Sequence, residues 1–387
     1  IKDKNFRGGL VVEPEEGIHF DVTVMDFASL YPSIIKVKNL SYETVRCSHE
    51  ECKKNSIPQT NHWVCTKKNG ISSVLIGSLR DLRVNYYKNM SKKDTITVEE
   101  KQLFTVVSQA LKVILNASYG VMGAEIFPLY FLPAAEATTA TGRHIILSTI
   151  EKCKQSGIGV LYGDTDSLFV KKPTPEQVEN IIAKAKSEHN VELEIEKEYR
   201  YVVLSGRKKN YLGVTKQGKV DVKGLTGKKS HTPPFIKALF YELLDILAEI
   251  KTVDDFERAK SKISDKISQC ARKVQAKEIP LKDLAFNVML SKAPAEYTKT
   301  IPQHIRAAKQ LESIREIKKG DKISYVKILN KPGVIPIEMA KASEIDSSKY
   351  MEFMESTLDQ LTSSMNLDFD VILGKPKQTG LEQFFWN

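Results

Sequence analysis

The alternation of apolar and polar residues predicts β-strands in separate parts of the chain. Residues 21–25 alternate as a half-buried strand does, and Asp26 follows at its end. Two further apolar runs, 160–162 and 168–170, flank the turn sequence Gly-Asp-Thr-Asp at 163–166. Apolar runs on either side of such a turn are typical of a β-hairpin. The pattern therefore predicts a hairpin with acidic residues at its tip, and further strands follow between residues 192 and 222.

A repeat of three to four residues predicts helices elsewhere. The segments 75–90 and 97–117 follow this period, and the polar stretch 91–95 separates them. Thr97 and Glu100 form a capping box, which starts the second of these helices. We therefore expect two antiparallel helices joined by a short polar turn. The second helix carries an apolar stripe made of Leu103, Val107, Leu111 and Ile114.

Helical patterns also dominate the rest of the chain. One helix is predicted at 134–152, and a capping box at Thr174-Pro175-Glu176-Gln177 starts another. From Thr232 onward, helical segments continue to about residue 320 and again from 348 to 365. The residues from Gly374 to the end show little periodicity.

Composition and charge narrow the class of protein. The chain has 387 residues, of which 41% are hydrophobic and 27% charged, so it can form two or three cores. Its formal net charge of +10 favours a polyanionic partner. No apolar run approaches the roughly 18 residues that a membrane span needs, and no secretory signal opens the chain. The five cysteines are too sparse for a disulfide scaffold. We therefore expect an intracellular protein, cytoplasmic if the source is prokaryotic.

Three aspartates are the leading candidates for chemistry. Asp164 and Asp166 alternate along a strand and so point to one side, while Asp26 ends another strand. Carboxylates packed together are unfavourable unless a cation lies between them. Two hard cations held in this way can activate a hydroxyl group and neutralise a triphosphate. Gly-Asp and Asp-Ser are also common turn signals, so each aspartate taken alone fits a plain turn as well.

Three stretches taken together resemble the A, B and C motifs of family B DNA polymerases. They are Asp-Phe-Ala-Ser-Leu-Tyr-Pro at 26–32, Lys-Val-Ile-Leu-Asn-Ala-Ser-Tyr-Gly at 112–120 and Tyr-Gly-Asp-Thr-Asp-Ser at 162–167. Ahead of them, Phe-Arg-Gly-Gly at 6–9 is similar to the family segment that joins the proofreading exonuclease to the polymerase. The chain begins almost at this segment. We therefore expect a fragment, for which the N-terminal and exonuclease portion is a candidate partner.

This resemblance implies an α+β fold with an antiparallel palm sheet, a two-helix fingers insertion and a mostly helical thumb. The first part of the palm is expected at 1–70, with a cysteine-containing insertion at 47–65. The fingers are expected at 71–120, the second part of the palm at 121–229, the thumb at 230–373 and a flexible tail at 374–387.

The resemblance also implies a site for two Mg²⁺ ions. Asp26 and Asp166 match the two carboxylates that bridge the metals in the family. Phe27 and Glu196 match further residues of the metal site. Asp164 belongs to the same acidic tip and is expected to act nearer the primer end.

A second group of residues is implied in binding the incoming nucleotide. Ser29 and Leu30, at the start of a helix, would offer backbone N–H groups to phosphate. Tyr31 matches the steric gate that lies under the sugar and excludes a 2′ hydroxyl. The matching nucleotide-binding face of the next motif consists of Lys112, Asn116 and Tyr119, which share one side of a helix.

The fingers contribute a cation in the family, and here the match is incomplete. Arg83 matches an arginine that binds the γ-phosphate, for which its forked guanidinium is suited. The family often has a lysine four residues later, where this chain has Tyr87. The neighbouring Lys88 would point about 100° away on an α-helix. The identity of the second fingers cation therefore stays open.

Basic and aromatic residues in the second half are implied in DNA binding. Lys208, Lys209 and Tyr211 resemble the Lys-Lys-x-Tyr element that follows the minor groove of the primer–template. Tyr297, His304 and Lys309 lie in a stretch similar to the DNA-facing segment of the thumb. Contacts of this kind carry affinity rather than sequence information.

The cysteine-containing insertion allows three interpretations. Cys47, Cys52, His62 and Cys65 are a ligand set of the type that holds a structural Zn²⁺, although their spacing is irregular. Archaeal relatives often carry a disulfide in this region, and Cys52 with Cys65 occupies similar positions. Free thiols are the third interpretation.

The end of the chain resembles the peptide by which replication proteins bind the ring-shaped sliding clamp. Gln378, Leu381, Phe384 and Phe385 have its spacing, and a basic Lys-Pro-Lys lead-in precedes them. The alternative is that the terminal aromatic residues fold back onto the thumb.

Taken together, the sequence predicts template-directed DNA synthesis from dNTPs on a primer–template. One alternative is a polymerase that makes RNA or reads an RNA template, against which Tyr31 argues. Another is a catalytically silent scaffold of the same family, against which the intact metal and phosphate motifs argue.

Overall fold

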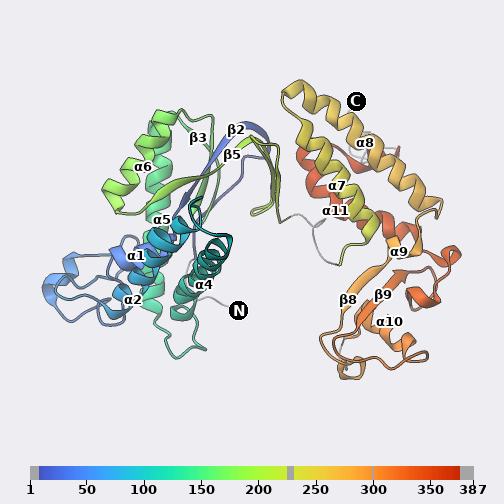
Figure 1. The fold of residues 1–387 in the computed structure, drawn as a ribbon, viewed down its shortest axis with the longest axis horizontal. Helices are drawn as coiled ribbons and strands as arrows, with labels where there is room; N and C mark the ends of the chain where they lie inside the picture. The colour runs from blue at the N-terminus through green and yellow to red at the C-terminus, as the bar shows by residue number, and fades with distance from the viewer. Residues whose placement is uncertain (1–7, 225–230, 299, 375–387) are drawn as a thin grey trace, which may run out of the picture. The chain divides into compact units, whose positions relative to one another are not determined.

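The computed structural model describes residues 8–224, 231–298 and 300–374. These residues form two compact units. The first comprises residues up to Glu15 together with Phe20–Tyr199, and the second comprises Glu16–His19 together with the chain from Arg200. Both combine helices with antiparallel strands (Figure 1), which confirms the expected α+β class. Among the residues described, no helix combines the length and apolar character that a membrane crossing requires.

The first unit is organised around an antiparallel sheet with the strand order β1-β3-β4-β2-β5. The predicted hairpin is β3 with β4, and β2 pairs with β4 in a register that sets Asp26 opposite Ser167. Because the side chains of a strand alternate between faces, the apolar residues of β2 and β4 divide between the two sides of the sheet. The strands are β1 (Val11–Val12), β2 (Gly17–Phe27), β3 (Gly159–Asp164), β4 (Ser167–Lys171) and β5 (Leu193–Leu204).

Helices cover one face of this sheet. Met25 and Leu168 lie in the same buried cluster as Ile34, Ala135 and Ile181, so three helices share a core with the sheet. The capping boxes predicted at Thr97 and Thr174 are both present. The helices of this unit are α1 (Leu30–Val37), the 3₁₀ turn η1 (Glu50–Lys54), α2 (Ile71–Asp81), the π-helix η2 (Leu82–Tyr87), α3 (Lys88–Met90), α4 (Val98–Met122), α5 (Leu132–Gln155) and α6 (Pro175–His189).

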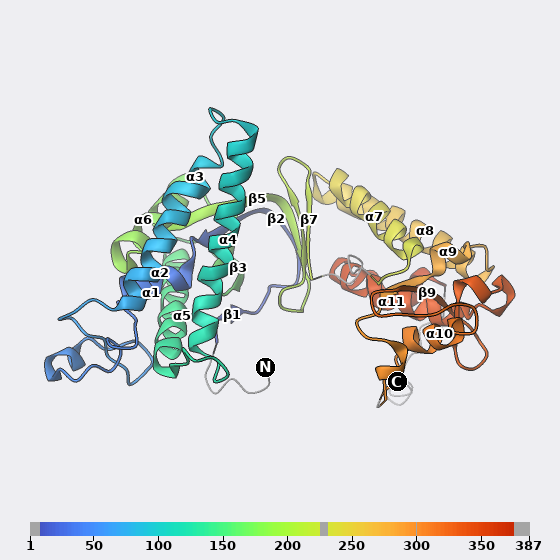
Figure 2. The ribbon, with the colours of Figure 1, turned by 60° about the horizontal axis from the view of Figure 1, so that its bottom comes forward.

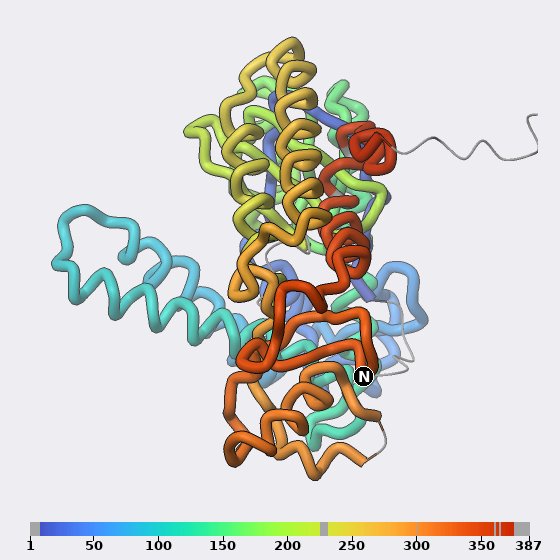
Figure 3. Tube along the Cα trace, turned by 90° about the vertical axis from the view of Figure 1, so that its right-hand side faces the viewer, coloured from blue at the N-terminus to red at the C-terminus, as the bar shows by residue number. Residues whose placement is uncertain are grey.

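The predicted helix pair is present, but its first member is not a uniform α-helix. It consists of α2, η2 and α3 in succession, and it runs antiparallel to α4 (Figures 2 and 3). The rings of Tyr86 and Tyr87 each lie 6.0 Å from the ring of Phe104, which joins η2 to α4. Only Leu111 of the predicted stripe is buried, whereas Leu103 and Ile114 are more than half exposed.

The second unit contains the end of β5, which β6 and β7 extend, and then a helical part with a small sheet. That sheet, of order β10-β9-β8, was not predicted from the sequence. Leu239 and Leu243 are buried as the helical pattern indicated. The remaining elements are β6 (Tyr211–Thr215), β7 (Val220–Lys223), α7 (Pro234–Glu249), α8 (Val253–Gln275), α9 (Leu281–Leu284), β8 (Phe286–Met289), η4 (Pro294–Glu296), α10 (Gln303–Leu311), β9 (Lys322–Lys327), β10 (Val334–Pro336), η5 (Ile337–Met339), η6 (Ala342–Glu344), α11 (Ser347–Thr362), η7 (Ser363–Met365) and α12 (Phe369–Ile372).

Candidate active site

Four acidic side chains gather where β2, the β3–β4 hairpin and β5 meet. Asp26 lies near the end of β2 and Asp164 at the end of β3, and both are opposite Ser167 of β4. The N–H group of Phe27 donates to the carbonyl of Asp166 over 2.8 Å, so the hairpin tip is fixed directly beside β2. We call Asp26, Asp164, Asp166 and Glu196 the carboxylate cluster.

The electrostatics of the carboxylate cluster reflect its crowding. Burial, followed by the charges of Asp166, Glu196 and Glu194, raises the pKa of Asp26 to about 7. Burial, and then the charge of Asp164, also raises the pKa of Asp166. Like charges in a partly buried site oppose one another's ionisation. The arrangement therefore favours a cation that would offset this repulsion.

The backbone at the hairpin tip and at the start of α1 adopts a conformation that side chains seldom favour. Thr165 has φ of 61° and Ser29 has φ of 53°, both in the left-handed region. Such strain is often found at functional sites. At the tip, the Thr165 N–H group donates to the carbonyl of Leu10, and the Asp166 N–H group donates to that of Asp164. Asp166 therefore lies in the turn and Asp164 at the end of β3, so the predicted alternation of the two aspartates along one strand is wrong.

A pocket of about 250 Å³ lies next to the carboxylate cluster. Its walls include Tyr31 from α1, Asn116 and Tyr119 from α4, and Asp166 from the hairpin. The rings of Tyr31 and Tyr119 are tilted against each other with centroids 4.7 Å apart. The structure thus brings the three predicted motifs to one place in the first unit.

Tyr31 is held in this pocket by close backbone contacts. A Cβ atom at Gly9 would lie 2.7 Å from the Tyr31 hydroxyl oxygen, and one at Gly142 would lie 3.0 Å from its ring. Only glycine leaves room at the first of these positions. The ring is therefore confined between α5 and the segment before β1, and burial raises the pKa of its hydroxyl.

Arg83 reaches the start of α1. Its guanidinium donates to the Ser29 hydroxyl over 2.6 Å and to the Ser108 carbonyl over 3.3 Å. Burial, followed by the charge of Arg80, lowers the pKa of Arg83, and the charges of Glu194 and Asp26 oppose this shift. From α4, the charge of the exposed Lys112 offsets a small part of the rise in the pKa of Asp166.

Lys88, whose role the sequence analysis left open, lies next to the carboxylate cluster through its contact with Glu194. Its N–H group donates to the carbonyl of Arg83, five residues earlier, as in a π-helix. The side chain of Lys88 pairs with Glu194, and its charge offsets a small part of the rise in the pKa of Asp26. The expected divergence of Lys88 assumed α-helical geometry, and that assumption was wrong for η2. The π-helical segment therefore ends with Lys88 paired to Glu194, while Arg83 binds Ser29 and Ser108.

Three charged residues near the site were missed in the sequence analysis. Glu194 lies two residues before Glu196, a spacing that puts both on one face of β5. Arg143 of α5 donates to the Gly8 carbonyl over 2.9 Å, and its charge acts on Tyr31. Arg80 is buried and pairs with Glu192 and Asp81. Of the three, only Glu194 had a sequence signal, namely its alternation with Glu196.

The DNA-binding candidates lie in the second unit. Lys208 and Lys209 occupy the turn between β5 and β6, where Lys209 has φ of 65°. A Cβ atom at Gly224 would overlap the Lys209 carbonyl, so this turn packs closely against the end of β7. Tyr211 begins β6, opposite Lys223.

The other DNA-binding candidates belong to the α10 region of the same unit. The ring of Tyr297 meets that of His304 edge to face at 6.4 Å, and burial lowers the pKa of His304. Lys309 is exposed on α10. The clamp-binding candidates Gln378, Leu381, Phe384 and Phe385 lie outside the described residues.

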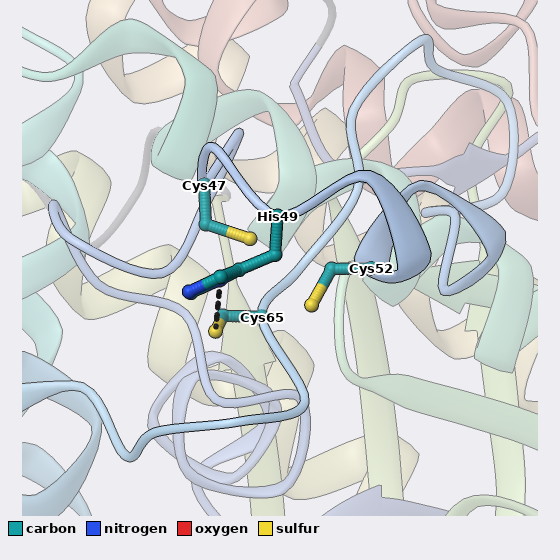
Figure 4. A group of neighbouring side chains, drawn as sticks. All are labelled: Cys47, His49, Cys52 and Cys65. Atoms are coloured by element: carbon teal, nitrogen blue, oxygen red, sulfur yellow. Dashed lines mark hydrogen bonds between the residues drawn. The ribbon is translucent and has the colours of Figure 1, made fainter.

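The structure of the cysteine-containing loop differs from two of the interpretations made from the sequence, the disulfide and the zinc site with His62. The structure records Cys47, Cys52 and Cys65 as free, so the Cys52–Cys65 disulfide is not formed. The predicted zinc set also included the wrong histidine. His62 turns away and lies 2.6 Å from a carboxylate oxygen of Glu136. The histidine that joins the three thiols is His49, as Figure 4 shows.

Comparisons with known proteins agree with the site. The family model described as DNA polymerase family B matches residues 1–371. DNA polymerase 1 of Saccharolobus solfataricus is 45% identical over 96% of this chain and 43% of that protein, and DNA polymerase 1 of Aeropyrum pernix is 41% identical over 97% and 39%. A solved structure titled as the family B DNA polymerase from the hyperthermophilic archaeon Pyrobaculum calidifontis superposes with a TM-score of 0.70 and 27% identity, covering 98% of this chain and 48% of that one. The chain spans less than half the length of these relatives, all of them archaeal. With motifs, fold and family model in agreement, the chain belongs to DNA polymerase family B.

Proposed function

We propose that this chain is the polymerase region of a DNA-directed DNA polymerase, which adds dNTPs to a primer 3′ end. One observation carries the proposal: the carboxylate cluster lies beside a pocket lined by Tyr31, Asn116 and Tyr119. Cations from two further helical segments face the same cluster. Acidic metal ligands, a phosphate-binding face and a sugar-sized pocket are together what nucleotide addition requires.

The donor set fits magnesium, the ion that this family implies. Mg²⁺ prefers carboxylate and carbonyl oxygens, and the site offers the carboxylates of Asp26 and Asp166 with the carbonyl of Phe27. Glu196 and Asp164 add charge close by. When bound, two Mg²⁺ ions would supply the charge that stabilises the attacking and leaving oxygens. The raised pKa of Asp26 is the electrostatic observation that this assignment explains.

The cationic side chains are proposed to bind the triphosphate. Arg83 and Lys88 approach from the π-helical segment and Lys112 from α4, and the carboxylate cluster lies near all three. The backbone N–H groups at Ser29 and Leu30 begin α1 and are suited to an anionic oxygen. Lys88 therefore takes the role that the family often gives to a lysine at the position of Tyr87, which here packs on Phe104.

Tyr31 is proposed to select deoxynucleotides. Its ring forms a wall of the pocket and has little freedom to move away, because Gly9 and Gly142 lie close behind it. A sugar placed on this ring would have no space for a 2′ hydroxyl. Tyr119, in contact with Tyr31, and Asn116 would border the base and the sugar of the incoming nucleotide.

Two further surfaces are proposed on the sequence resemblance and the positions of the residues. Lys208, Lys209 and Tyr211, and separately Tyr297, His304 and Lys309, would contact the primer–template backbone. The fingers would correspond to 71–120 and the thumb to 230–373.

Residues 378–385 would bind a sliding clamp and so raise the local concentration of the enzyme at the primer end. Replacing both Phe384 and Phe385 with Ala should abolish clamp binding in calorimetry but preserve clamp-independent synthesis.

Primer extension tests the central proposal. The full chain is incubated with a 5′-labelled primer–template, dNTPs and Mg²⁺, and the same reaction is run with EDTA and with the Asp166→Asn variant. We expect stepwise extension only with wild-type protein and metal. A folded chain that binds the primer–template but extends no primer across a series of Mg²⁺ concentrations and temperatures would indicate a silent scaffold. Extension with rNTPs as efficient as with dNTPs would contradict the assignment of Tyr31.

A further inference from the structure

A second group of ligand-type side chains lies apart from the carboxylate cluster. The Sγ atoms of Cys47, Cys52 and Cys65 and a ring nitrogen of His49 all lie within 4.8 Å of one another. The three cysteines are buried, and His49 is partly buried. Figure 4 shows the three sulfur atoms and the imidazole converging on one small space. We call these four residues the Cys/His cluster.

The spacing of these atoms is close to that of ligands around one tetrahedral ion. A tetrahedron with metal–sulfur bonds of about 2.3 Å has edges of about 3.8 Å. The Nδ1 atom of His49 lies 3.5 Å from Sγ of Cys65, close to such an edge. Small side-chain rotations would bring the remaining atoms to this distance. Three thiols and one imidazole form a ligand set that selects zinc rather than magnesium or calcium.

Hydrogen bonds to the sulfur atoms support the ionised form of the cysteines. The N–H group of Thr66 donates to Sγ of Cys52 over 3.4 Å, and the N–H group of Lys67 donates to Sγ of Cys65 over 3.4 Å. Backbone N–H groups that point at sulfur atoms in this way are typical partners of metal-bound cysteines, and they leave the sulfur atoms directed at the shared space.

The surrounding loop holds the four ligands in position with little regular structure. Cys65 donates its N–H group to the Thr44 carbonyl over 2.9 Å, and the indole of Trp63 donates to the Cys47 carbonyl over 2.9 Å. Apart from η1, which carries Cys52, the segment 47–65 contains no helix or strand longer than an isolated bridge. An insertion with so small a core is the kind of segment that a metal ion stabilises.

The cluster also lies at the base of the helix pair that carries Arg83 and Lys88. Asn39, which follows α1, donates to the carbonyl of Cys65 over 3.1 Å and accepts from the N–H group of Gly70 over 2.7 Å. Gly70 directly precedes α2. Fixing Cys65 therefore helps to fix the starting point of α2.

From these observations we propose that Cys47, His49, Cys52 and Cys65 form a structural zinc site, which anchors the insertion beneath α2. The ion is bound by three thiolates and by Nδ1 of His49, and all four positions are taken by the protein. A closed ligand set of this type serves stability rather than chemistry. This proposal does not depend on the polymerase activity proposed above.

Metal analysis of the purified full chain is the first test. Protein is prepared without chelators, and its zinc content is measured by elemental mass spectrometry. Peptide mapping under non-reducing conditions shows whether the cysteines are free or form a disulfide. We expect one zinc per chain and no Cys52–Cys65 disulfide. Wild-type protein loaded with Co²⁺ should show the visible absorption of tetrahedral thiolate coordination. A folded, zinc-free wild-type chain, or one with the disulfide formed, would overturn the proposal.

Matched variants test the ligand set. Loss of a residue that only hydrogen-bonds to a metal ligand typically weakens metal binding by roughly 10–100-fold. His49→Ala removes a ligand itself, so it should weaken zinc binding by at least this factor. His62→Ala should leave the zinc content at one, because His62 faces Glu136 instead. Cys52→Ser should lose zinc, whereas Cys270→Ser, which lies in the second unit, should retain it. Loss of zinc in His62→Ala together with retention in His49→Ala would refute the assignment. The spectrum of the wild-type cobalt protein remains informative even if Cys52→Ser fails to fold.

Discussion

The carboxylate cluster and the Cys/His cluster are both groups of ligand-type side chains in the first unit, yet they are built in opposite ways. The carboxylate cluster lies on paired strands and the turn between two of them, where strand register sets Asp26 and Asp164 and a backbone hydrogen bond from Phe27 sets Asp166. The Cys/His cluster lies on a loop that only short bridges support. The paired strands hold the carboxylate cluster together despite the repulsion between its charges. In the Cys/His cluster, by contrast, the proposed zinc ion would hold the loop in place. We therefore expect changes in the first to alter chemistry and changes in the second to alter stability.

The largest effect is expected from Asp26→Asn. This substitution removes a metal-binding charge, and loss of several kcal/mol of charge stabilisation corresponds to a decrease in the rate of nucleotide addition of roughly 10³-fold or more. The melting temperature should not fall, because the substitution also relieves repulsion with Asp166 and Glu196. Single-turnover extension and calorimetric melting measure the two quantities. Near-normal extension, or a pronounced loss of stability, would break the contrast between the clusters.

A smaller effect is expected from Lys88→Ala. If Lys88 contacts the triphosphate, the loss of one charge-assisted contact of about 1.5–3 kcal/mol should lower kcat/KM for dNTP by roughly 10–100-fold. Lys92→Ala, on an exposed lysine beyond the π-helical turn, is the control and should behave as wild type. Steady-state extension with varied dNTP measures both. Equal behaviour of the two variants would show that Lys88 serves only its contact with Glu194.

Tyr31→Ala should change selectivity more than rate. Removal of the ring opens space beside the sugar, so the ratio of rNTP to dNTP incorporation should rise by about 10–200-fold, the range for a small group in a pocket. Competition between the two nucleotide types on one template measures this ratio. Tyr119→Ala, which removes the neighbouring ring, is the matched comparison and should shift the ratio less. An unchanged ratio for Tyr31→Ala would place the gate elsewhere.

The smallest effect on synthesis is expected from Cys65→Ser. At moderate temperature the extension rate should stay within about twofold of wild type, since no reacting group is touched. Loss of a structural metal belongs to the few changes that cost several kcal/mol, so the melting temperature of the first unit should fall by roughly 5–10 °C. Scanning calorimetry with and without added zinc measures the shift. A slow but fully stable variant would reverse the assignment of roles to the two clusters.

The positions of Asp26 and Asp164 near the ends of strands could be predicted because regular structure determines them. Asp166, by contrast, lies in the two-residue turn between Asp164 and Ser167, where its carbonyl accepts from the Phe27 N–H group, so its place follows from the turn and not from alternation along a strand. The loop at 47–65 offered no such rule. Its sequence contains both His49 and His62, and only the folded loop determines which one faces the thiols.

Other differences have similar physical causes. The strands of the small sheet in the second unit are short, and β8 is separated from its partner β9 by η4 and α10, so no local pattern signals the pairing of β8 with β9. On α4 the apolar spacing was real, but the helix pair leaves Leu103 and Ile114 largely exposed because it packs chiefly along η2. Arg80 and Arg143 gave no signal, since a lone arginine on a helix is normally a surface residue.

The π-helical turn has a consequence for comparing this chain with others residue by residue. A turn closed by a bond from Lys88 to Arg83 contains one residue more than an α-helical turn would. In space, the cation lies one turn from Arg83, as an Arg-x-x-x-Lys pair would on an α-helix. On the role proposed for Lys88, Arg83 and Lys88 would act as a cationic pair one turn apart, although they lie five residues apart along the chain.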